Sequence, residues 1–339
     1  MIGFPSTRLG LDPGTANTLL YVHGRGVAVN EPSLVRIRTA SGHIEAVGGE
    51  AEASRGRTPG KVQTARPIRS GVISDLPLFD GMLHRFLRKA RLRQPWQRIK
   101  AAIAVPGGLT EVERLAIVES IRNARATEVL LVDQVLAAAR GAGLPIEESR
   151  GRMIVNIGAG VTDAAVLSLG DVICARTSKV AGDEMDAAVA AYVRAAHQLI
   201  IGERTAERLK CEIGSAVVGH PELQLPVKGR CLVHGIPREV VIRDGEIREA
   251  ISPALERIVH AIRETLEQTP PELSADLIET GIVLTGGSAL LRNLNRYISA
   301  DCGLPVKVAA NPLSSVILGL AYQLSHLRAR EWRRFAHRH

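Results

Sequence analysis

Residues 12–18 read Asp-Pro-Gly-Thr-Ala-Asn-Thr, and residues 156–163 read Asn-Ile-Gly-Ala-Gly-Val-Thr-Asp. Apolar segments flank each stretch, so each one predicts a β-hairpin that turns at glycine. A glycine turn lets backbone N–H groups converge on an anion because no Cβ stands in the way. One such loop alone is more often a plain turn. Two loops of the same design in two parts of the chain predict a grip on the phosphates of a nucleotide.

Extended and helical patterns alternate outward from each hairpin, and this order predicts two similar α/β halves. Thr110 and Glu113 predict a capping box at the start of a helix that runs to Ala124. A third glycine turn, at residues 284–288, follows a short strand and precedes a helix expected from Ala289. The other expected elements are strands at 99–106, 129–132 and 223–242, and helices at 136–142, 183–199, 203–214 and 252–267.

The glycine turns differ from the common nucleotide-binding loops. No GxxxxGK[ST] stretch occurs, and no GxGxxG follows the first strand. Asp12 lies at the end of the first strand, where a carboxylate could hold the water shell of Mg²⁺. The third turn would let the backbone approach a base or a ribose closely. The pattern therefore favours a phosphate grip made of two hairpins.

Composition favours a globular protein of about two domains, since 45 % of the 339 residues are hydrophobic and 23 % are charged. No apolar run reaches the roughly 18 residues that a membrane helix needs, and the N-terminus lacks the regions of a signal peptide. We therefore expect a cytoplasmic protein. Four scattered cysteines, none of them in a CxxC pair, argue against a disulfide framework or a metal site.

The net charge of +8 is concentrated at residues 88–100 and 328–338. Each stretch is either a solvated basic face or a surface for anionic lipid. Trp96, Leu92 and Arg93 predict an interfacial membrane anchor, with Trp96 capping the domain core as the alternative. The C-terminal tail is expected to be a second membrane contact or a disordered end. No nucleic-acid partner is expected, because no recognised nucleic-acid module is present.

Ten short motifs together resemble one branch of the actin, DnaK-type chaperone and sugar-kinase superfamily. That branch is the MreB/Mbl family of bacterial actin-like proteins, and the resemblance covers about residues 8–320. This chain is similar to a divergent member. The motifs are GTANT (14–18), NEPS (30–33), GRTPG (56–60), GLTEVER (108–114), GAGLP (141–145), AGDEMD (181–186), IGERTAE (201–207), EIGSA (212–216), TPPEL (269–273) and GIVLTGG (281–287).

The resemblance implies an actin-like α/β fold of two related domains with a nucleotide cleft between them. Domain I is expected at 1–147, with a small subdomain at about 30–75 and with residues 315–339 packing back on it. Domain II is expected at 148–314, with a small subdomain at about 182–250.

The resemblance also implies a site for ATP (or GTP) with Mg²⁺, which Asp12 would hold through water. Glu207 and Lys210 would border the ribose and base, with a surface salt bridge between them as the alternative. Gly286 and Gly287 would pack on the adenosine side. The residues expected to hold the phosphates are Gly14, Thr15, Ala16 and Asn17 in the first loop, and Gly158, Ala159, Gly160 and Thr162 in the second.

Three departures from the family pattern bear on catalysis, for which we expect Asp12, Gln134 and Asn156 to act. The family usually has Asp-Leu-Gly in the first loop, where this chain has Pro13, which lacks an N–H. Its second loop usually opens Asp-Ile-Gly-Gly-Gly, where Asn156 cannot act as a base. Its Glu-Glu-Pro is replaced by Asp133-Gln134-Val135, and glutamine can orient water without taking its proton. We predict nucleotide binding with slow or absent hydrolysis: at most a weak ATPase coupled to polymerisation.

By resemblance, the chain is expected to form head-to-tail polymers in paired protofilaments at the inner face of the cell membrane. These filaments would organise cell-wall synthesis and cell shape together with membrane proteins of the wall-synthesis machinery. A non-polymerising, nucleotide-dependent regulator on the same fold is the alternative. A chaperone is disfavoured because no peptide-binding domain is evident, and a small-molecule kinase because no substrate-binding insertion or suitable catalytic Asp is evident.

Overall fold

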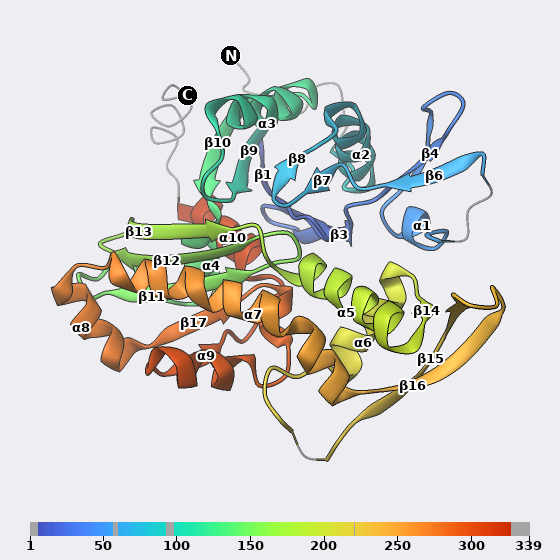
Figure 1. The fold of residues 1–339 in the computed structure, drawn as a ribbon. Coiled ribbons are helices and arrows are strands. Elements are labelled where there is room, and N and C mark those ends of the chain that lie inside the picture. Colours follow the sequence, from blue (N-terminus) through green and yellow to red (C-terminus); the bar gives the residue numbers. More distant parts are fainter. Residues whose placement is uncertain (1–5, 57–59, 93–97, 220, 327–339) are drawn as a thin grey trace. The chain divides into compact units, whose positions relative to one another are not determined.

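The computed structural model describes residues 6–56, 60–92, 98–219 and 221–326 (Figure 1). The chain divides into two compact units: unit 1 comprises Met1–Pro145 and Leu313–His339, and unit 2 comprises Ile146–Pro312. Unit 2 is therefore one continuous insertion in unit 1. Along the part of the chain that the structure describes, no helix is long and apolar enough to cross a bilayer.

Unit 1 is built on a five-stranded sheet in the order β10-β9-β1-β2-β3. The first predicted hairpin is present as β1 and β2, and β1 also pairs in parallel with β9. Leu9 and Leu11 of β1 join the core that contains Phe79 and Phe86 of α2. Gly10, between the two leucines, faces Leu320 of α10 instead. The strands are β1 (Ser6–Pro13), β2 (Asn17–Val22), β3 (Gly26–Pro32), β9 (Arg98–Val105) and β10 (Ala126–Asp133).

The helices of unit 1 include the predicted one with the Thr110–Glu113 capping box, which is confirmed in α3. A smaller sheet, β5-β4-β6, and a two-stranded sheet, β7-β8, complete the unit. The helices are α1 (Gly49–Glu52), α2 (Leu76–Lys89), α3 (Glu111–Asn123), α4 (Gln134–Gly141) and α10 (Ser315–His326), and the small strands are β4 (Val35–Arg38), β5 (Ile44–Val47), β6 (Val62–Ala65), β7 (Ile68–Arg69) and β8 (Val72–Ile73).

Helix α10 returns the chain to unit 1 and packs against α4 at backbone distance. A Cβ added at Gly141 would lie 1.7 Å from the Ser315 carbonyl oxygen, and one added at Gly319 would lie 1.8 Å from that of Ala137. Only glycine lets two helices approach so closely, because any side chain at either position would overlap the facing backbone. These two glycines therefore dock the last helix of the described chain on unit 1.

Unit 2 repeats the plan of unit 1 with the sheet order β13-β12-β11-β17-β18. Its hairpin, β11-β12, again has a parallel partner, β17, on its other side. The predicted pair of similar α/β halves is thus confirmed. The long helix α7 packs on β12 and β13 (Figure 1). The strands of the sheet are β11 (Arg152–Ile157), β12 (Thr162–Ser168), β13 (Asp171–Ser178), β17 (Ile282–Thr285) and β18 (Val306–Val308).

Two helix predictions in unit 2 were wrong in their bounds. Helix α7 begins at Asp244, not near 252, because the Glu246 side chain accepts a hydrogen bond from the Arg243 backbone N–H at the true start. Pro253, which favours a helix start, lies inside the helix. The expected helix from Ala289 is a short 3₁₀ turn. The remaining elements are α5 (Gly182–His197), β14 (Leu199–Ile200), α6 (Glu203–Ile213), β15 (Gln224–Cys231), β16 (Pro237–Arg243), α7 (Asp244–Glu267), α8 (Pro271–Thr280), η1 (Gly287–Leu290) and α9 (Leu294–Cys302).

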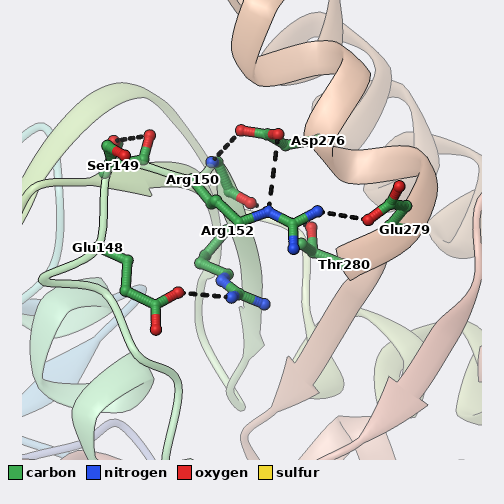
Figure 2. Close-up of polar contacts among 9 residues, drawn as sticks. Glu148, Ser149, Arg150, Arg152, Asp276, Glu279 and Thr280 are labelled. Atoms are coloured by element: carbon green, nitrogen blue, oxygen red, sulfur yellow. Dashed lines mark hydrogen bonds and ion pairs between the residues drawn. The ribbon is translucent and has the colours of Figure 1, made fainter.

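Polar contacts dock α8 on the start of β11 (Figure 2). The Gly151 backbone N–H donates to Asp276 Oδ2 (2.7 Å), and Thr280 Oγ1 donates to the Gly151 carbonyl (3.0 Å). Arg150 adds ion pairs with Asp276 (3.8 Å) and Glu279 (2.5 Å). The glycine is required at this position, because an added Cβ would lie 2.7 Å from the backbone oxygen of Leu273.

Replacement of Asp276 and Glu279 in turn separates the two kinds of contact. We expect Asp276→Ala to lower the free energy of unfolding by about 1–3 kcal/mol, because it leaves a part-buried N–H without its acceptor. The matched variant Glu279→Ala should cost less than about 1 kcal/mol, since that pair is exposed and screened. Urea denaturation followed by circular dichroism measures both. Equal losses would contradict this division.

Candidate functional site

The first glycine loop joins β1 to β2 in unit 1, and Ser33 holds it from outside. Pro13 pairs with Thr18, which leaves residues 14–17 between the paired ends of the hairpin. The Ser33 hydroxyl donates to the Gly14 carbonyl (2.6 Å), and the Ser33 backbone N–H donates to the Ala16 carbonyl (2.7 Å). The loop is therefore fixed by the NEPS segment rather than by its own residues alone.

The side chains of this loop are also held in place. Thr15 Oγ1 accepts a hydrogen bond from the Gly71 backbone N–H (3.2 Å). Asn17 Nδ2 donates to Asn30 Oδ1 (3.1 Å), a second contact with the NEPS segment. Pro13 lies beyond the part of β1 that pairs with β9, which ends at Leu11, so its missing N–H costs no bond to β9.

Asp12 precedes the first loop with its carboxyl group buried: the side chain is 8 % exposed. Burial raises the pKa of Asp12 to about 7. A nearby cation would offset this burial and favour the ionised form, so the residue fits a role near Mg²⁺. No group of three or more metal-ligating side chains occurs within the described ranges.

The second glycine loop, residues 158–161, joins β11 to β12 in unit 2. Two of its carbonyls, like two of the first loop, are bonded by segments outside the loop. The Gly158 carbonyl accepts from Ser288 Oγ (2.8 Å) and from the Gly182 backbone N–H (3.2 Å). The Ala159 carbonyl accepts from the Asp183 backbone N–H (2.8 Å). The start of α5 and the turn η1 therefore both position this loop.

Two side chains beside the second loop are buried and hydrogen-bonded. Thr162 Oγ1 donates to the Val180 carbonyl (2.7 Å), so this hydroxyl ties the end of the loop to the segment before α5. Asn156 Oδ1 accepts from Thr285 Oγ1 (3.2 Å), and the two residues are opposite each other on the paired strands β11 and β17. The amide oxygen of Asn156 is thus already engaged by the protein.

Lys210 is linked to the second loop through the start of α5. Its Nζ forms an ion pair with Asp186 (2.8 Å) and donates to the Gly182 carbonyl (3.0 Å). Glu207, one turn earlier on α6, is exposed. The ion pair that the structure gives for Lys210 is thus with Asp186. Burial raises the pKa of Asp186 to about 6, although Lys210 opposes this shift.

The third glycine turn packs directly on the second loop. A Cβ added at Gly286 would lie 2.3 Å from the Ile157 carbonyl oxygen, and its φ of 84° also favours glycine. Gly287 begins η1 and carries Ser288 towards the Gly158 carbonyl. The sequence motifs contained or adjoined Ser33 and Ser288, but reasoning from the sequence gave neither a role.

The remaining predicted residues are placed as follows. Gln134 is the first residue of α4 in unit 1 and is half-buried. Leu92 was expected in an exposed anchor, and this is wrong, because its side chain is 3 % exposed and packs in the unit 1 core. Arg93 and Trp96 lie outside the described residues, as does the C-terminal tail from residue 327.

Comparison with known proteins gives consistent relatives. The family model described as MreB/Mbl protein matches residues 6–331. The cell shape-determining protein MreB of Escherichia coli is 45 % identical over 324 residues, which cover 94 % of this chain and 93 % of that protein. The cell shape-determining protein Mbl of Bacillus subtilis is 38 % identical over 319 residues, which cover 94 % and 96 %.

Solved structures agree with the fold. The crystal structure of MreB5 of Spiroplasma citri bound to AMPPNP has a TM-score of 0.89 and 37 % identity, and covers 93 % of this chain and 94 % of that one. A second MreB5 structure, bound to ADP, is equally similar, with a TM-score of 0.89 and 36 % identity. The MamK double helical filament has a TM-score of 0.82 at 22 % identity and thus shares the fold.

Asp12 makes a pH-dependent prediction for nucleotide-free protein. Its folded-state pKa lies near 7, against an ordinary value of 3.8, so its contribution to stability is present below about pH 4 and is lost as pH rises through 7. Asp12→Asn removes this titration. We expect the variant to gain melting temperature relative to the parent between pH 5 and pH 8. A difference in Tm that stays constant over this range, measured by scanning calorimetry, would contradict the assignment.

Proposed function

Because this chain belongs to the MreB/Mbl family of bacterial actin-like proteins, we propose that it is a nucleotide-binding subunit that polymerises and determines cell shape. The observation that carries the proposal is the glycine loop in each unit, in which segments outside the loops bond to the carbonyls of Gly14, Ala16, Gly158 and Ala159. Such loops offer backbone N–H groups to an anion. Relatives that are named for cell shape supply the biological context.

The proposed ligand is an adenine nucleotide, since the similar MreB5 protein was crystallised with AMPPNP and with ADP. Residues 14–17 and 158–162 would bind phosphate oxygens through backbone amides and the Thr15 hydroxyl. Glu207, Lys210 and the Gly286-Gly287 turn would contact the adenosine. Mg²⁺, held through water by Asp12, would neutralise part of the phosphate charge.

We propose that hydrolysis is slow or lost. A general base must accept a proton, and neither Asn156 nor Gln134 has a group that does so near neutral pH. Asn156 also has its amide oxygen bonded to Thr285, which fixes it as an orienting group. Gln134 could still align an attacking water, so residual turnover is consistent with the proposal.

Polymerisation is proposed to be head-to-tail with paired protofilaments, and the filaments to organise wall synthesis with membrane proteins. The filamentous relative MamK shares the fold, which is compatible with this assembly but leaves its contacts open. A non-polymerising regulator is the second candidate. Its sequence support is the loss of the usual acidic residues at positions 134 and 156.

Peripheral attachment to the inner face of the cell membrane is a separate proposal. It rests on Trp96 and Arg93 within the basic stretch 88–100. Leu92 contributes to the core of unit 1 instead of to the lipid contact. The proposed lipid contact therefore keeps Arg93 and Trp96 and no longer includes Leu92.

Nucleotide-dependent assembly is tested by fluorescent ATP titration and by pelleting with and without Mg-ATP. We expect the parent protein to bind and to pellet. Ala159→Asp should lose both properties, because it places a negative charge in the second loop. The control Leu169→Asp places the same charge at an exposed turn of the same sheet and should still bind. Binding without pelleting would favour the regulator, and absence of binding would refute the proposal.

The same preparations test hydrolysis by phosphate release from pelleted polymer, with Escherichia coli MreB alongside. We expect this chain to be the slower of the two. The double variant Gln134→Glu, Asn156→Asp should raise its rate by at least about tenfold, because it restores both carboxylates. A parent rate equal to that of the relative would contradict slow hydrolysis.

Membrane attachment is tested by sedimentation with anionic liposomes. Trp96→Ala should lose lipid binding at unchanged melting temperature. Leu92→Ala should instead lower stability by about 2–5 kcal/mol, because it removes a buried core side chain. Equal lipid binding by the parent and Trp96→Ala would rule out Trp96 as the anchor.

A further inference from the structure

In both units, loop carbonyls accept hydrogen bonds from outside the loop, while some of the loop amides donate none within the described residues. The carbonyls of Gly14, Ala16, Gly158 and Ala159 all accept bonds from segments outside the loops. By contrast, across the described parts of both units, no hydrogen bond is donated by three of the four backbone N–H groups that follow. These three are the amides of Thr15, Ala159 and Gly160, whereas the fourth belongs to Asn17, which pairs with Pro32 at the start of β2.

The planar peptide group explains why the two states are linked. The carbonyl of one residue and the N–H of the next belong to the same trans peptide and point in opposite directions. A bond that holds the Gly14 carbonyl outward therefore directs the Thr15 amide the other way. A bond to the Gly158 carbonyl does the same for the Ala159 amide. A hydrogen bond that fixes the carbonyl therefore also sets the direction of the next backbone N–H.

A serine hydroxyl provides one of these outer bonds in each unit. Ser33 is fully buried and reaches Gly14 O at 2.6 Å, while its Oγ also lies 2.8 Å from Thr18 Oγ1. Ser288 is 9 % exposed and reaches Gly158 O at 2.8 Å. The two serines come from unrelated segments, the end of a strand and a 3₁₀ turn. In each unit, therefore, a serine hydroxyl donates to a carbonyl of the glycine loop.

Gly182 leaves the space that the hydrogen bond between Ser288 and Gly158 needs. A Cβ added at Gly182 would lie 2.8 Å from Ser288 Oγ and 3.3 Å from Lys210 Nζ. Gly182 in turn donates its N–H to Gly158 and accepts from Lys210 with its carbonyl. Gly182 at the start of α5 thus links the Gly158 carbonyl of the loop to Lys210 of the proposed adenosine helix.

We propose that Ser33 and Ser288 are positioning residues for nucleotide binding: their hydroxyls hold the Gly14 and Gly158 carbonyls outward so that the loop amides face the phosphates. This inference rests on the proposed nucleotide function. Neither serine touches the ligand; each acts through the peptide group that it orients. Their removal should therefore affect ligands in proportion to their phosphates.

The test compares ATP, ADP and adenosine, the last by competition with a fluorescent nucleotide. Ser288→Ala should weaken ATP and ADP by about 3- to 10-fold, the effect of one lost hydrogen bond, and adenosine by less than about twofold. Ser288→Thr keeps the hydroxyl and should restore phosphate binding. Ser299→Ala removes a similar hydroxyl-to-carbonyl bond, to Leu304 (2.8 Å), away from the loops and should leave all three affinities unchanged.

The outcomes are separable. Unchanged ATP affinity in Ser288→Ala, or equal losses for ATP and adenosine, would overturn the positioning role. A parent protein that fails to bind ATP would instead refute the proposed function. Melting temperatures are measured in parallel, and if Ser288→Ala does not fold, Ser33→Ala makes the same comparison in unit 1. Loss of phosphate selectivity there would support the inference, and its retention would overturn it.

Discussion

The carbonyl oxygen of Gly158 accepts two hydrogen bonds, from the Ser288 hydroxyl and the Gly182 amide, and the candidate site of unit 2 depends on this convergence. A tight turn between two strands has no ladder partners for its own carbonyls, so other segments must satisfy them. In unit 2 these segments are the start of α5 and the turn η1. In unit 1 the NEPS segment has this role through Ser33. The backbone position of each loop is consequently set by the elements that bond to its carbonyls.

The repeated sheet explains how those elements come to lie there. In both units the hairpin occupies the centre of a five-stranded sheet, with an antiparallel strand on one side and parallel strands on the other. Parallel strands end at the same edge of a sheet, so the segment that follows β17 arrives beside the loop that follows β11. Gly286 allows that segment to approach to backbone distance. Gly286 therefore serves the packing of this turn on the end of β11 as well as any contact with a ligand.

The features that could be predicted from the sequence were those that a few neighbouring residues determine. The two hairpins and the Thr110–Glu113 capping box belong to this group. The start of α7 was missed because its cap joins a carboxylate to a backbone N–H at Arg243, which has no typical capping side chain, while Pro253 imitates a helix start. Burial of Leu92 was missed because it depends on the whole unit 1 core. Ser288 bonds to a residue 130 positions away, and no local pattern encodes such a contact.

The glycine contact of α4 with α10 has a consequence for the order in which the protein is made. The five strands of the unit 1 sheet have all been synthesised by Asp133, but the helix that covers Gly10 of β1 begins only at Ser315. Unit 2, continuous from Ile146 to Pro312, leaves the ribosome in between. The nascent chain therefore carries an incomplete first unit throughout the synthesis of the second, with this sheet face not yet covered by its helix.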